Sequence, residues 1–243
     1  MRENSKSIIL VQIKLMQKIV ILTGAGMSAE SGIKTFRDAD GLWEGHDVMD
    51  VASPQGFARN PELVLDFYNQ RRRQLLNVKP NSAHIAVADL ETLFDITIVT
   101  QNVDDLHERA GSNDVLHLHG ELLKVRSTLN ANLIYSRTKD INLGDTCEEG
   151  SQLRPHIVWF GEEVPMLEKA IKITATADIL IIVGTSMQVY PAAGLVNYIK
   201  PNIPIYFIDP KPSVSQHSFN NLTIISEKAT NGVKTLIDNY LSG

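Results

Sequence analysis

Short apolar runs separated by longer, more polar stretches constrain this 243-residue chain more than any other feature. Most of the runs are rich in Ile and Val and show little alternation of apolar and polar residues, which is typical of parallel strands buried on both faces. Helical stretches fall between them, and this succession predicts an α/β fold with a doubly wound parallel sheet. The expected strands are 19–22, 96–99, 115–118, 156–160, 179–183, 204–208 and 222–225, and the expected helices are Pro61–Leu76, Ser82–Leu93, Pro165–Thr176, Ala192–Ile199 and Asn231–Leu241.

The composition excludes several classes of protein. Apolar residues make up 43% of the chain, which is enough for a sizeable core, and the net charge of −5 argues against nucleic acid as the main partner. The single cysteine, Cys147, excludes internal disulfides and fits a reducing compartment. No apolar run approaches the ~20 residues that a membrane span needs. We therefore expect a cytoplasmic monomer with no membrane association, in which residues 1–15 form an N-terminal extension rather than a signal peptide.

Two stretches interrupt the succession of strands and helices and predict a second, smaller unit. Residues 34–79 contain several Gly and Pro residues followed by a basic helix, and residues 121–153 are polar and rich in expected loops. We interpret both as insertions that together form a small domain. The large domain would then consist of residues 16–33, 80–120 and 154–241.

The segment GAGMSAESGIKTFR, Gly24–Arg37, directly follows the first expected strand. Gly24 and Gly26 let the backbone turn tightly and let a phosphate approach closely, because they carry no Cβ. Ser28 could cap a helix whose first N–H groups face an anion. Strand, glycine turn and helix is the layout that binds a dinucleotide pyrophosphate, although this motif alone fits a structural turn equally well.

Polar residues follow several other expected strands. Ligands of open parallel sheets bind beyond the carboxyl ends of the strands, and Gln101, Asn102 and Asp104 are expected at such an end. Amide groups can bind a carboxamide or a ribose hydroxyl there, but Asn102 or Asp104 could instead cap the next helix. The segment Gly184–Ser186 repeats the strand-then-turn pattern, and Asp209 follows a further strand, where a carboxylate could bind a ribose hydroxyl.

The segment HLHGE, His117–Glu121, ends another apolar run. Side chains alternate along a strand, so His117 and His119 would share one face. The pair could be half of a metal site, although no Cys or third His lies nearby in sequence, or either residue could be a core histidine. Alternatively, His119 could act as a general base that takes a proton from a sugar hydroxyl. We expect His107 to be structural.

The segment RPHIVWFGE, Arg154–Glu162, enters and leaves an expected buried strand. Val158, Trp159 and Phe160 could be ordinary core residues. An exposed strand end could instead offer its backbone to an extended peptide.

Tyr68 and Arg71 lie three residues apart in the basic helix and therefore share one helix face. Arg71 could bind a carboxylate with two donors, and Tyr68 could add a third. The alternative is a solvated basic face formed by the run Arg71–Arg73, which taken alone is the favoured interpretation.

Together these segments closely resemble the sirtuins, the NAD-dependent protein-lysine deacylases. The motifs GAGMSAESGIKTFR, TQNVDD, HLHGE, RPHIVWFGE and GTS occur in the family's order and spacing, from about Met16 to Leu241. The resemblance implies a Rossmann-like NAD-binding domain, a small domain built from two insertions, and an acyl-lysine tunnel between them. It implies His119 as the general base, with Asn102 and Asp104 as further catalytic residues. The implied NAD-binding residues are Gly24, Ala25, Gly26, Ala29, Phe36, Arg37, Gln101, Asn102, Asp104, His119, Gly184, Thr185, Ser186, Asp209 and Ala229.

The resemblance also implies the reaction and its substrates. The acyl oxygen of an acylated protein lysine attacks the ribose carbon that carries nicotinamide, and the products are nicotinamide, O-acyl-ADP-ribose and free lysine. Val158, Trp159 and Phe160 would line the acyl-lysine groove. Tyr68 and Arg71 match the Tyr-x-x-Arg pair of the class that removes acidic acyl groups, and a buried carboxylate costs several kcal/mol unless it is paired. Succinyl- and malonyl-lysine are therefore expected substrates, with acetyl-lysine also accepted, as in similar bacterial enzymes.

The chain departs from the family pattern in its small domain. The family usually has four cysteines there that hold a structural Zn²⁺, whereas this chain has only Cys147, and Ser127 stands about where the first cysteine would be. A tetrahedral site needs four ligands, so we predict no metal and a degenerate zinc-ribbon part within 121–153. A smaller departure is Asp209, where an Asn is common.

Two other functions remain open from the sequence. A protein mono-ADP-ribosyltransferase would share the step in which nicotinamide leaves. A catalytically weak, NAD-sensing binding protein is the non-enzymatic alternative, although the intact HLHGE and TQNVDD motifs speak against it. A hydride-transferring dehydrogenase is disfavoured, because no acidic residue ends a second apolar strand about 20 residues after the glycine turn.

Overall fold

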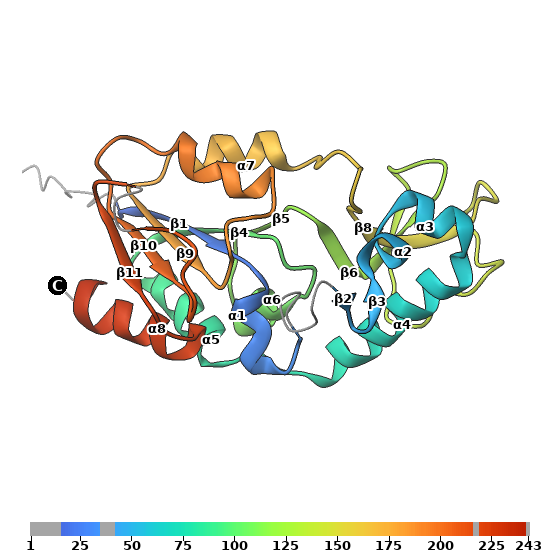
Figure 1. The fold of residues 1–243 in the computed structure, drawn as a ribbon, viewed down its shortest axis with the longest axis horizontal. Coiled ribbons are helices and arrows are strands. Elements are labelled where there is room, and N and C mark those ends of the chain that lie inside the picture. The colour runs from blue at the N-terminus through green and yellow to red at the C-terminus, as the bar shows by residue number, and fades with distance from the viewer. Residues whose placement is uncertain (1–15, 35–41, 216–218, 242–243) are drawn as a thin grey trace, which may run out of the picture.

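The computed structural model describes residues 16–34, 42–215 and 219–241, and its largest feature is a parallel six-stranded sheet in the order β11-β10-β9-β1-β4-β5 (Figure 1). The strands of this sheet are β1 Lys18–Thr23, β4 Asp95–Thr100, β5 Val115–His117, β9 Ile179–Val183, β10 Ile205–Ile208 and β11 Leu222–Ile225. The main helices around it are α1 Ala25–Ser28, α5 Ser82–Asp89, α6 Leu106–Ala110, α7 Leu167–Thr174 and α8 Ala229–Leu236, with the 3-10 helix η3 Ala192–Tyr198. The predicted α/β fold with a doubly wound parallel sheet is therefore confirmed.

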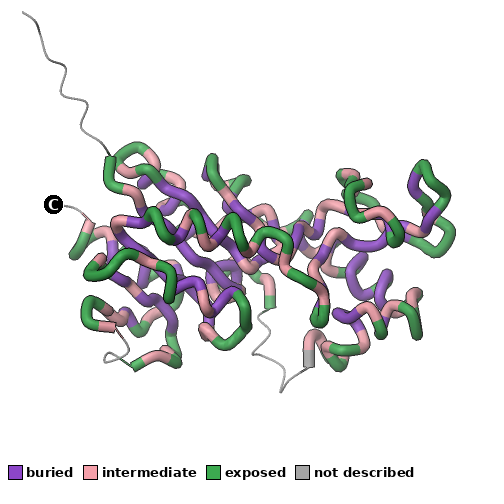
Figure 2. The backbone as a smooth tube through the Cα atoms, turned by 90° about the horizontal axis from the view of Figure 1, so that it is seen from above, coloured by how far each residue is buried: buried purple, intermediate pink, exposed green. Residues whose placement is uncertain are grey.

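The sheet is buried on both faces, which explains why its strands show little polar alternation. Ile19 and Ile21 of β1 pack in a cluster with residues of α5 and α8, whereas Val20 and Leu22 pack in a second cluster with residues of α7 and η3. Figure 1 shows α7 on one side of the sheet and α5 and α8 on the other, and Figure 2 shows that the buried residues gather in the interior of the backbone trace.

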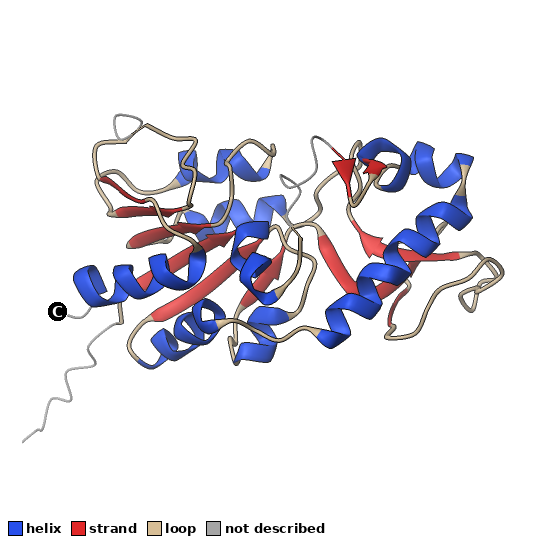
Figure 3. Cartoon of the chain, turned by 60° about the horizontal axis from the view of Figure 1, so that its bottom comes forward, coloured by secondary structure: helices blue, strands red, loops and turns tan. Residues whose placement is uncertain are grey.

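A separate antiparallel sheet, in the order β7-β6-β8, forms the centre of the smaller unit (Figure 3). Its strands are β6 Gly120–Ser127, β7 Ile134–Ser136 and β8 Leu153–Ile157, and a short hairpin joins β2 Leu42–Trp43 to β3 His46–Asp47. The helices of this unit are α2 Val48–Val51, α3 Pro54–Arg59 and α4 Pro61–Asn77. Phe67 and Tyr68 of α4 pack with Leu122 and Ile157, so the helix covers the small sheet.

One predicted strand was wrong. The run 156–160 is not a strand of the main sheet: its beginning belongs to β8, which pairs antiparallel with β6. We had interpreted the region around β6 as loop, because its GELLKVRS sequence is half polar and only one face of it is buried. The proposed boundary of the large domain at residue 154 consequently falls inside β8, and residues 154–157 belong to the small sheet.

The predicted helices are present, with shifted ends. The expected Pro61–Leu76 and Ser82–Leu93 correspond to α4 and to α5 followed by the 3-10 turn η2 Leu90–Thr92. The expected 231–241 begins earlier, as α8, and ends in the π-helix η5 Ile237–Leu241. Residues 29–31 form a further 3-10 turn, η1 Ala29–Ser31.

Candidate active site

The carboxyl ends of the parallel strands are in register, so the residues that follow them meet at one edge of the sheet. Thr23 at the end of β1 pairs with Thr100 of β4 and with Val183 of β9. A cavity of about 720 Å³ lies beyond this edge and reaches into the small unit. Its lining includes Gly24, Ala25, Gly26, Ala29, Gln101, Asn102, Asp104, His119, Gly184, Thr185, Ser186, Asp209, Tyr68, Arg71, Val158, Trp159 and Phe160.

The glycine turn packs against the turn that follows β9. Gly24 N–H donates to the Val183 carbonyl at 3.0 Å, and Gly26 N–H donates to the Gly184 carbonyl at 2.8 Å. A Cβ on Gly26 would lie 2.6 Å from Gly184 Cα, and one on Gly184 would lie 2.4 Å from Met27 N. The glycines are therefore required for the contact of two loops, a reason that the sequence argument about phosphate approach had missed.

Asn102 and Asp104 are joined by a buried hydroxyl. Ser28 Oγ donates to Asp104 Oδ2 at 2.9 Å and accepts from Asn102 Nδ2 at 3.1 Å. Asp104 Oδ1 also accepts the N–H of Leu106, the first residue of α6, although the N-cap of that helix is Asp105. Burial raises the pKa of the Asp104 carboxyl, and the Ser28 hydrogen bond opposes that shift.

Ser28 was expected to cap a helix, and this was wrong. It is the last residue of the short α1 and makes no capping bond. Its hydroxyl instead binds the two site residues, and His84 Nε2 lies 3.5 Å from it. Nothing local in the sequence marks this role, because its partners lie more than 50 residues away.

The two histidines of the HLHGE segment differ in how their ring nitrogens are used. Both nitrogens of His117 have partners, the Asn102 carbonyl at 3.0 Å and Glu108 at 2.7 Å, and Glu108 raises the pKa of His117. Within the described part of the chain, His119 has one hydrogen-bond partner, the Gln101 carbonyl, which lies 3.1 Å from Nδ1. A proton on Nδ1 would leave the lone pair of Nε2 unshared, and burial lowers the pKa of His119, so the neutral imidazole is favoured.

His107 is a buried core histidine, as the sequence suggested. Its Nε2 lies 3.2 Å from Thr23 Oγ1, and its ring packs edge-on against His84 at 4.9 Å between centroids. Burial lowers the pKa of His107 to about 3 and that of His84 to about 4. Both rings are therefore neutral at physiological pH.

The segment after β8 is clamped against the small unit. Arg154 stacks on the Trp159 ring, 3.3 Å from guanidinium carbon to ring centroid, and donates to Glu162 at 2.6 Å. Glu162 accepts the Trp159 N–H, and Val158 N–H donates to the His119 carbonyl at 2.9 Å. Phe160 N–H donates to the Ala52 carbonyl at 2.9 Å. The N–H groups of Val158, Trp159 and Phe160 therefore all have partners within the protein. A peptide at this segment would contact its side chains and carbonyl groups.

Tyr68 is buried at the small-unit end of the cavity. Its hydroxyl accepts a hydrogen bond of 2.9 Å from the Trp159 indole N–H. Burial raises the pKa of the Tyr68 phenol well above its ordinary value, so the group keeps its proton. That O–H remains a donor for a ligand.

Arg71 belongs to the cavity and not to a solvated basic face. Its side chain is 14% exposed, whereas that of Arg73 is 51% exposed. Arg71 Nη1 donates to the Phe67 carbonyl at 2.7 Å, and Nε is buried without a hydrogen-bond partner among the described residues. Arg72 is fully buried and binds Asn69 and the Leu122 carbonyl, so it is structural.

Most of the predicted site residues line this one cavity, with three exceptions. Ala229, the first residue of α8, packs in the core beside the sheet, and its neighbour Lys228 lines the cavity instead. Phe36 and Arg37 lie outside the described residues. The sequence argument missed Ser28, Lys34 and Glu44 as cavity residues, since none of them belongs to a strand end or a charged cluster.

The lining fits a dinucleotide. A volume of about 720 Å³ is in the range of cofactor sites. Glycine-rich turns from β1 and β9 form one wall, where a pyrophosphate can lie close to backbone, and Asp209, Asn102 and Gln101 supply groups that bind ribose hydroxyls and a carboxamide. Gln101 Nε2 is itself held by Thr185 Oγ1 at 3.1 Å.

The region of the expected zinc ribbon does not fit a zinc ion. Cys147 Sγ lies 3.1 Å from Ser151 Oγ, and Ser151 is hydrogen-bonded to Ser127, which also accepts the N–H groups of Leu129 and Asn130. Two serine hydroxyls and one thiol are a poor set for Zn²⁺. Within the described ranges, no group of three or more His, Cys, Asp or Glu residues could hold a metal ion.

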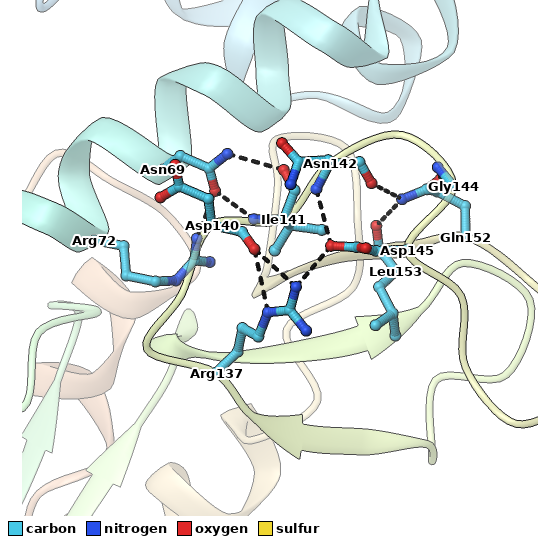
Figure 4. Close-up of polar contacts among 10 residues, drawn as sticks. All are labelled: Asn69, Arg72, Arg137, Asp140, Ile141, Asn142, Gly144, Asp145, Gln152 and Leu153. Atoms are coloured by element: carbon cyan, nitrogen blue, oxygen red, sulfur yellow. Dashed lines mark hydrogen bonds and ion pairs between the residues drawn. The ribbon is translucent and has the colours of Figure 1, made fainter.

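Polar contacts attach the loop after β7 to helix α4 (Figure 4). Asn69 of α4 donates to the Ile141 carbonyl at 2.8 Å and accepts the Ile141 N–H at 2.9 Å. Arg137 donates to the Asp140 carbonyl and to Asp145, whose own carbonyl accepts the Leu153 N–H. The loop is thus held by hydrogen bonds along its length.

The parallel sheet, its glycine turns and the adjoining small unit define a Rossmann-like α/β protein with a dinucleotide-type crevice. The Sir2 family model matches residues 24–191, and the chain belongs to this family, the sirtuins. A Helicobacter pylori protein named NAD-dependent protein deacylase is 60% identical over 91% of this chain and 96% of its own length. A protein of the same name from Bacteroides thetaiotaomicron is 51% identical over 91% of this chain and 97% of its own.

Solved structures agree with the family assignment. A Sir2 homologue in complex with NAD superposes with a TM-score of 0.83 at 40% identity, covering 93% of this chain and 90% of the other. A Sir2 mutant with a deacetylated p53 peptide and 3'-O-acetyl ADP-ribose gives a TM-score of 0.77 at 29% identity, covering 93% and 94%. In the parts of the chain that the structure describes, no helix has the length and apolarity to cross a membrane.

Proposed function

We propose that this sirtuin is an NAD-dependent protein-lysine deacylase that removes succinyl and malonyl groups and also accepts acetyl groups. One observation carries the preference for acidic acyl groups. The largely buried side chain of Arg71 lines the same cavity as His119, and its Nε has no hydrogen-bond partner among the described residues. The family membership and the deacylase names of relatives at 51% and 60% identity support the general activity.

The reacting end of the cavity is built for proton transfer. NAD, when bound, supplies the ribose carbon that accepts the acyl oxygen and the nicotinamide that leaves. His119 acts there as the general base toward a ribose hydroxyl, with Nδ1 held by the Gln101 carbonyl and Nε2 free to accept the proton. Asn102 and Asp104, fixed through Ser28, orient the ligand groups that lie over the ends of β1 and β4.

The other end of the cavity recognises the acyl group. Trp159 and Val158 give the acyl-lysine chain an apolar passage, with Phe160 at its more exposed end. Arg71 and the protonated Tyr68 hydroxyl then bind the terminal carboxylate, which would otherwise be buried unpaired. An acetyl group is too short to reach this pair.

The test compares peptides that differ only in their acyl group. Purified protein with NAD should release lysine from a succinyl peptide and form nicotinamide and O-acyl-ADP-ribose. Arg71→Met should lower kcat/KM for the succinyl peptide by about thirtyfold or more, while the acetyl peptide changes much less. Arg73→Met, on the exposed side of the same helix, is the matched control. Equal losses for both peptides, or label from the adenylate of NAD remaining on protein, would contradict the proposal.

We further propose that the protein is a cytoplasmic monomer without structural zinc and with no nucleic-acid partner. Its net charge of −5 and single cysteine support the location and the lack of nucleic-acid binding. The Ser127, Ser151 and Cys147 cluster supports a zinc-free small domain, since the hydroxyls and thiol bind one another.

A further inference from the structure

Glu44 lies at the tip of the β2–β3 hairpin and points its carboxylate toward Arg71. Glu44 and Gly45 form the turn, both with positive φ, 51° and 83°. Glu44 Oε2 lies 3.7 Å from Arg71 Nη2 and 3.0 Å from Lys34 Nζ. The Glu44 side chain is 17% exposed, and it lines the cavity together with Lys34 and Arg71.

Arg71 has no other carboxylate within ion-pair distance in the described residues. Its remaining contacts are neutral: Nη1 donates to the Phe67 carbonyl, and the guanidinium lies 3.9 Å from the Phe67 ring centroid. Burial lowers the pKa of Arg71, and Glu44 opposes that shift, ahead of the weaker effects of Tyr68 and Asp66. Glu44 is therefore the counter-ion of Arg71 when the cavity holds no acidic ligand.

We propose that Glu44 determines acyl specificity by competing with the substrate carboxylate for Arg71. This rests on the proposed function, in which Arg71 binds acidic acyl groups. With an acetyl group in the tunnel, Glu44 keeps the buried guanidinium paired, so a neutral acyl group is tolerated. With a succinyl group, two carboxylates share one guanidinium, and Glu44 must turn toward Lys34.

Lys34 makes this exchange possible. Its ammonium group pairs with Oε2, the same Glu44 oxygen that lies nearest Arg71, and the Lys34 side chain is 68% exposed, so it is able to follow the carboxylate. Glu44 thus has a second partner while the substrate occupies Arg71. The result is a tunnel that accepts neutral and acidic acyl groups.

The experiment measures kcat/KM for matched succinyl and acetyl peptides in Glu44→Gln. Loss of the competing charge should raise the ratio of succinyl to acetyl kcat/KM by about fivefold or more, mainly through a lower KM for the succinyl peptide. Glu168→Gln removes an exposed carboxylate on α7 and should leave the ratio unchanged. Glu44→Asn, which suits the positive φ of the turn better, is the second variant and should act as Glu44→Gln does.

The outcomes separate this inference from the proposed function. A wild-type protein that does not hydrolyse the succinyl peptide refutes the proposed function. The role of Glu44 alone is refuted by a different result. In it, the wild type hydrolyses the succinyl peptide, the Glu44 variants are well folded, and their ratio of succinyl to acetyl kcat/KM stays within twofold of the wild type or shifts toward acetyl. Titration of succinyl peptide into each variant should show tighter binding in Glu44→Gln, and equal affinities would also overturn the inference.

Discussion

At the scale of single residues, environment rather than identity decides what each histidine of the site does. The buried rings of His84 and His107 pack against each other and are neutral. His117 is paired with Glu108. His119 uses Nδ1 to bind the Gln101 carbonyl, and its Nε2 has no hydrogen-bond partner among the described residues. From the residues alone His119 as a general base was one of three open interpretations, and the family resemblance favoured it. The pairing of His117 with Glu108 could not be predicted, because it depends on where α6 lies relative to β5.

The pH dependence of catalysis should report the state of His119. Burial holds the pKa of His119 below its ordinary value of 6.5, so the basic form persists as the pH falls. We expect kcat/KM to stay level from pH 8 down to about 6.5 and to decline only below it. His119→Ala should lose at least about a hundredfold in kcat. A decline that begins above pH 7 in the wild type would contradict this assignment.

Acid should destabilise the protein through His84 and His107. Their folded-state pKa values of about 4 and about 3 lie below those of the unfolded chain, so the unfolded state binds more protons. The contribution of these two histidines to the free energy of unfolding should therefore be fully present well above pH 6.5 and be lost as the pH falls from 6.5 to about 3. Thermal unfolding at several pH values measures this. In His107→Gln the free energy of unfolding should change less steeply with pH than in the wild type.

At the scale of elements, the segment from β8 to Glu162 shows where sequence reasoning reached its limit. The apolar run suggested a core strand, and the side chains do pack, but β8 pairs with β6 in the small sheet. Strands with near-continuous apolar sequence, such as β1 and β9, could be predicted because both faces are covered. The strand β6 could not be predicted from the sequence, because its burial and its bulge depend on partners that are distant in sequence.

Glu162 is expected to hold Val158–Phe160, the proposed substrate-binding residues, in place. Its carboxylate binds Arg154, Arg126 and the Trp159 N–H, so Glu162→Gln removes a charge from a largely buried cluster. The expected result is a higher KM for acyl peptides and a loss of about 1–3 kcal/mol in the free energy of unfolding. Kinetics and urea denaturation measure both. Glu168→Gln is the control. An unchanged KM in Glu162→Gln would contradict the role of Glu162 in positioning this segment.

At the scale of the whole molecule, the two sheets meet at the cavity, and the small unit is held by packing and hydrogen bonds. Phe67 and Tyr68 of α4 pack on the small sheet, and the loop after β7 is attached through Asn69 and Ile141 (Figure 4). The parallel sheet could be predicted from the sequence, and the division into two insertions stays a prediction. The contacts that stabilise residues 121–153 could not be predicted, because hydrogen bonds of serine and asparagine side chains leave no pattern in the sequence.

Chelation should not affect stability. Under the proposal of a zinc-free small unit, EDTA or phenanthroline at millimolar concentration should leave the melting temperature unchanged within error, and metal analysis should find well under one equivalent of zinc. Asn69→Ala should lower the melting temperature, because it removes both hydrogen bonds to Ile141. A drop in melting temperature on chelation would show that a metal is bound.

The hydrogen bond from Val158 N–H to the His119 carbonyl joins the point where the chain enters the small unit to the point where it returns. The residues from β6 to β8 form a closed stretch of chain between these two points, and it is also held to α4 through Asn69 and Ile141. Sequence changes far out in this closed stretch therefore leave the backbone positions of His119 and Val158 fixed to one another.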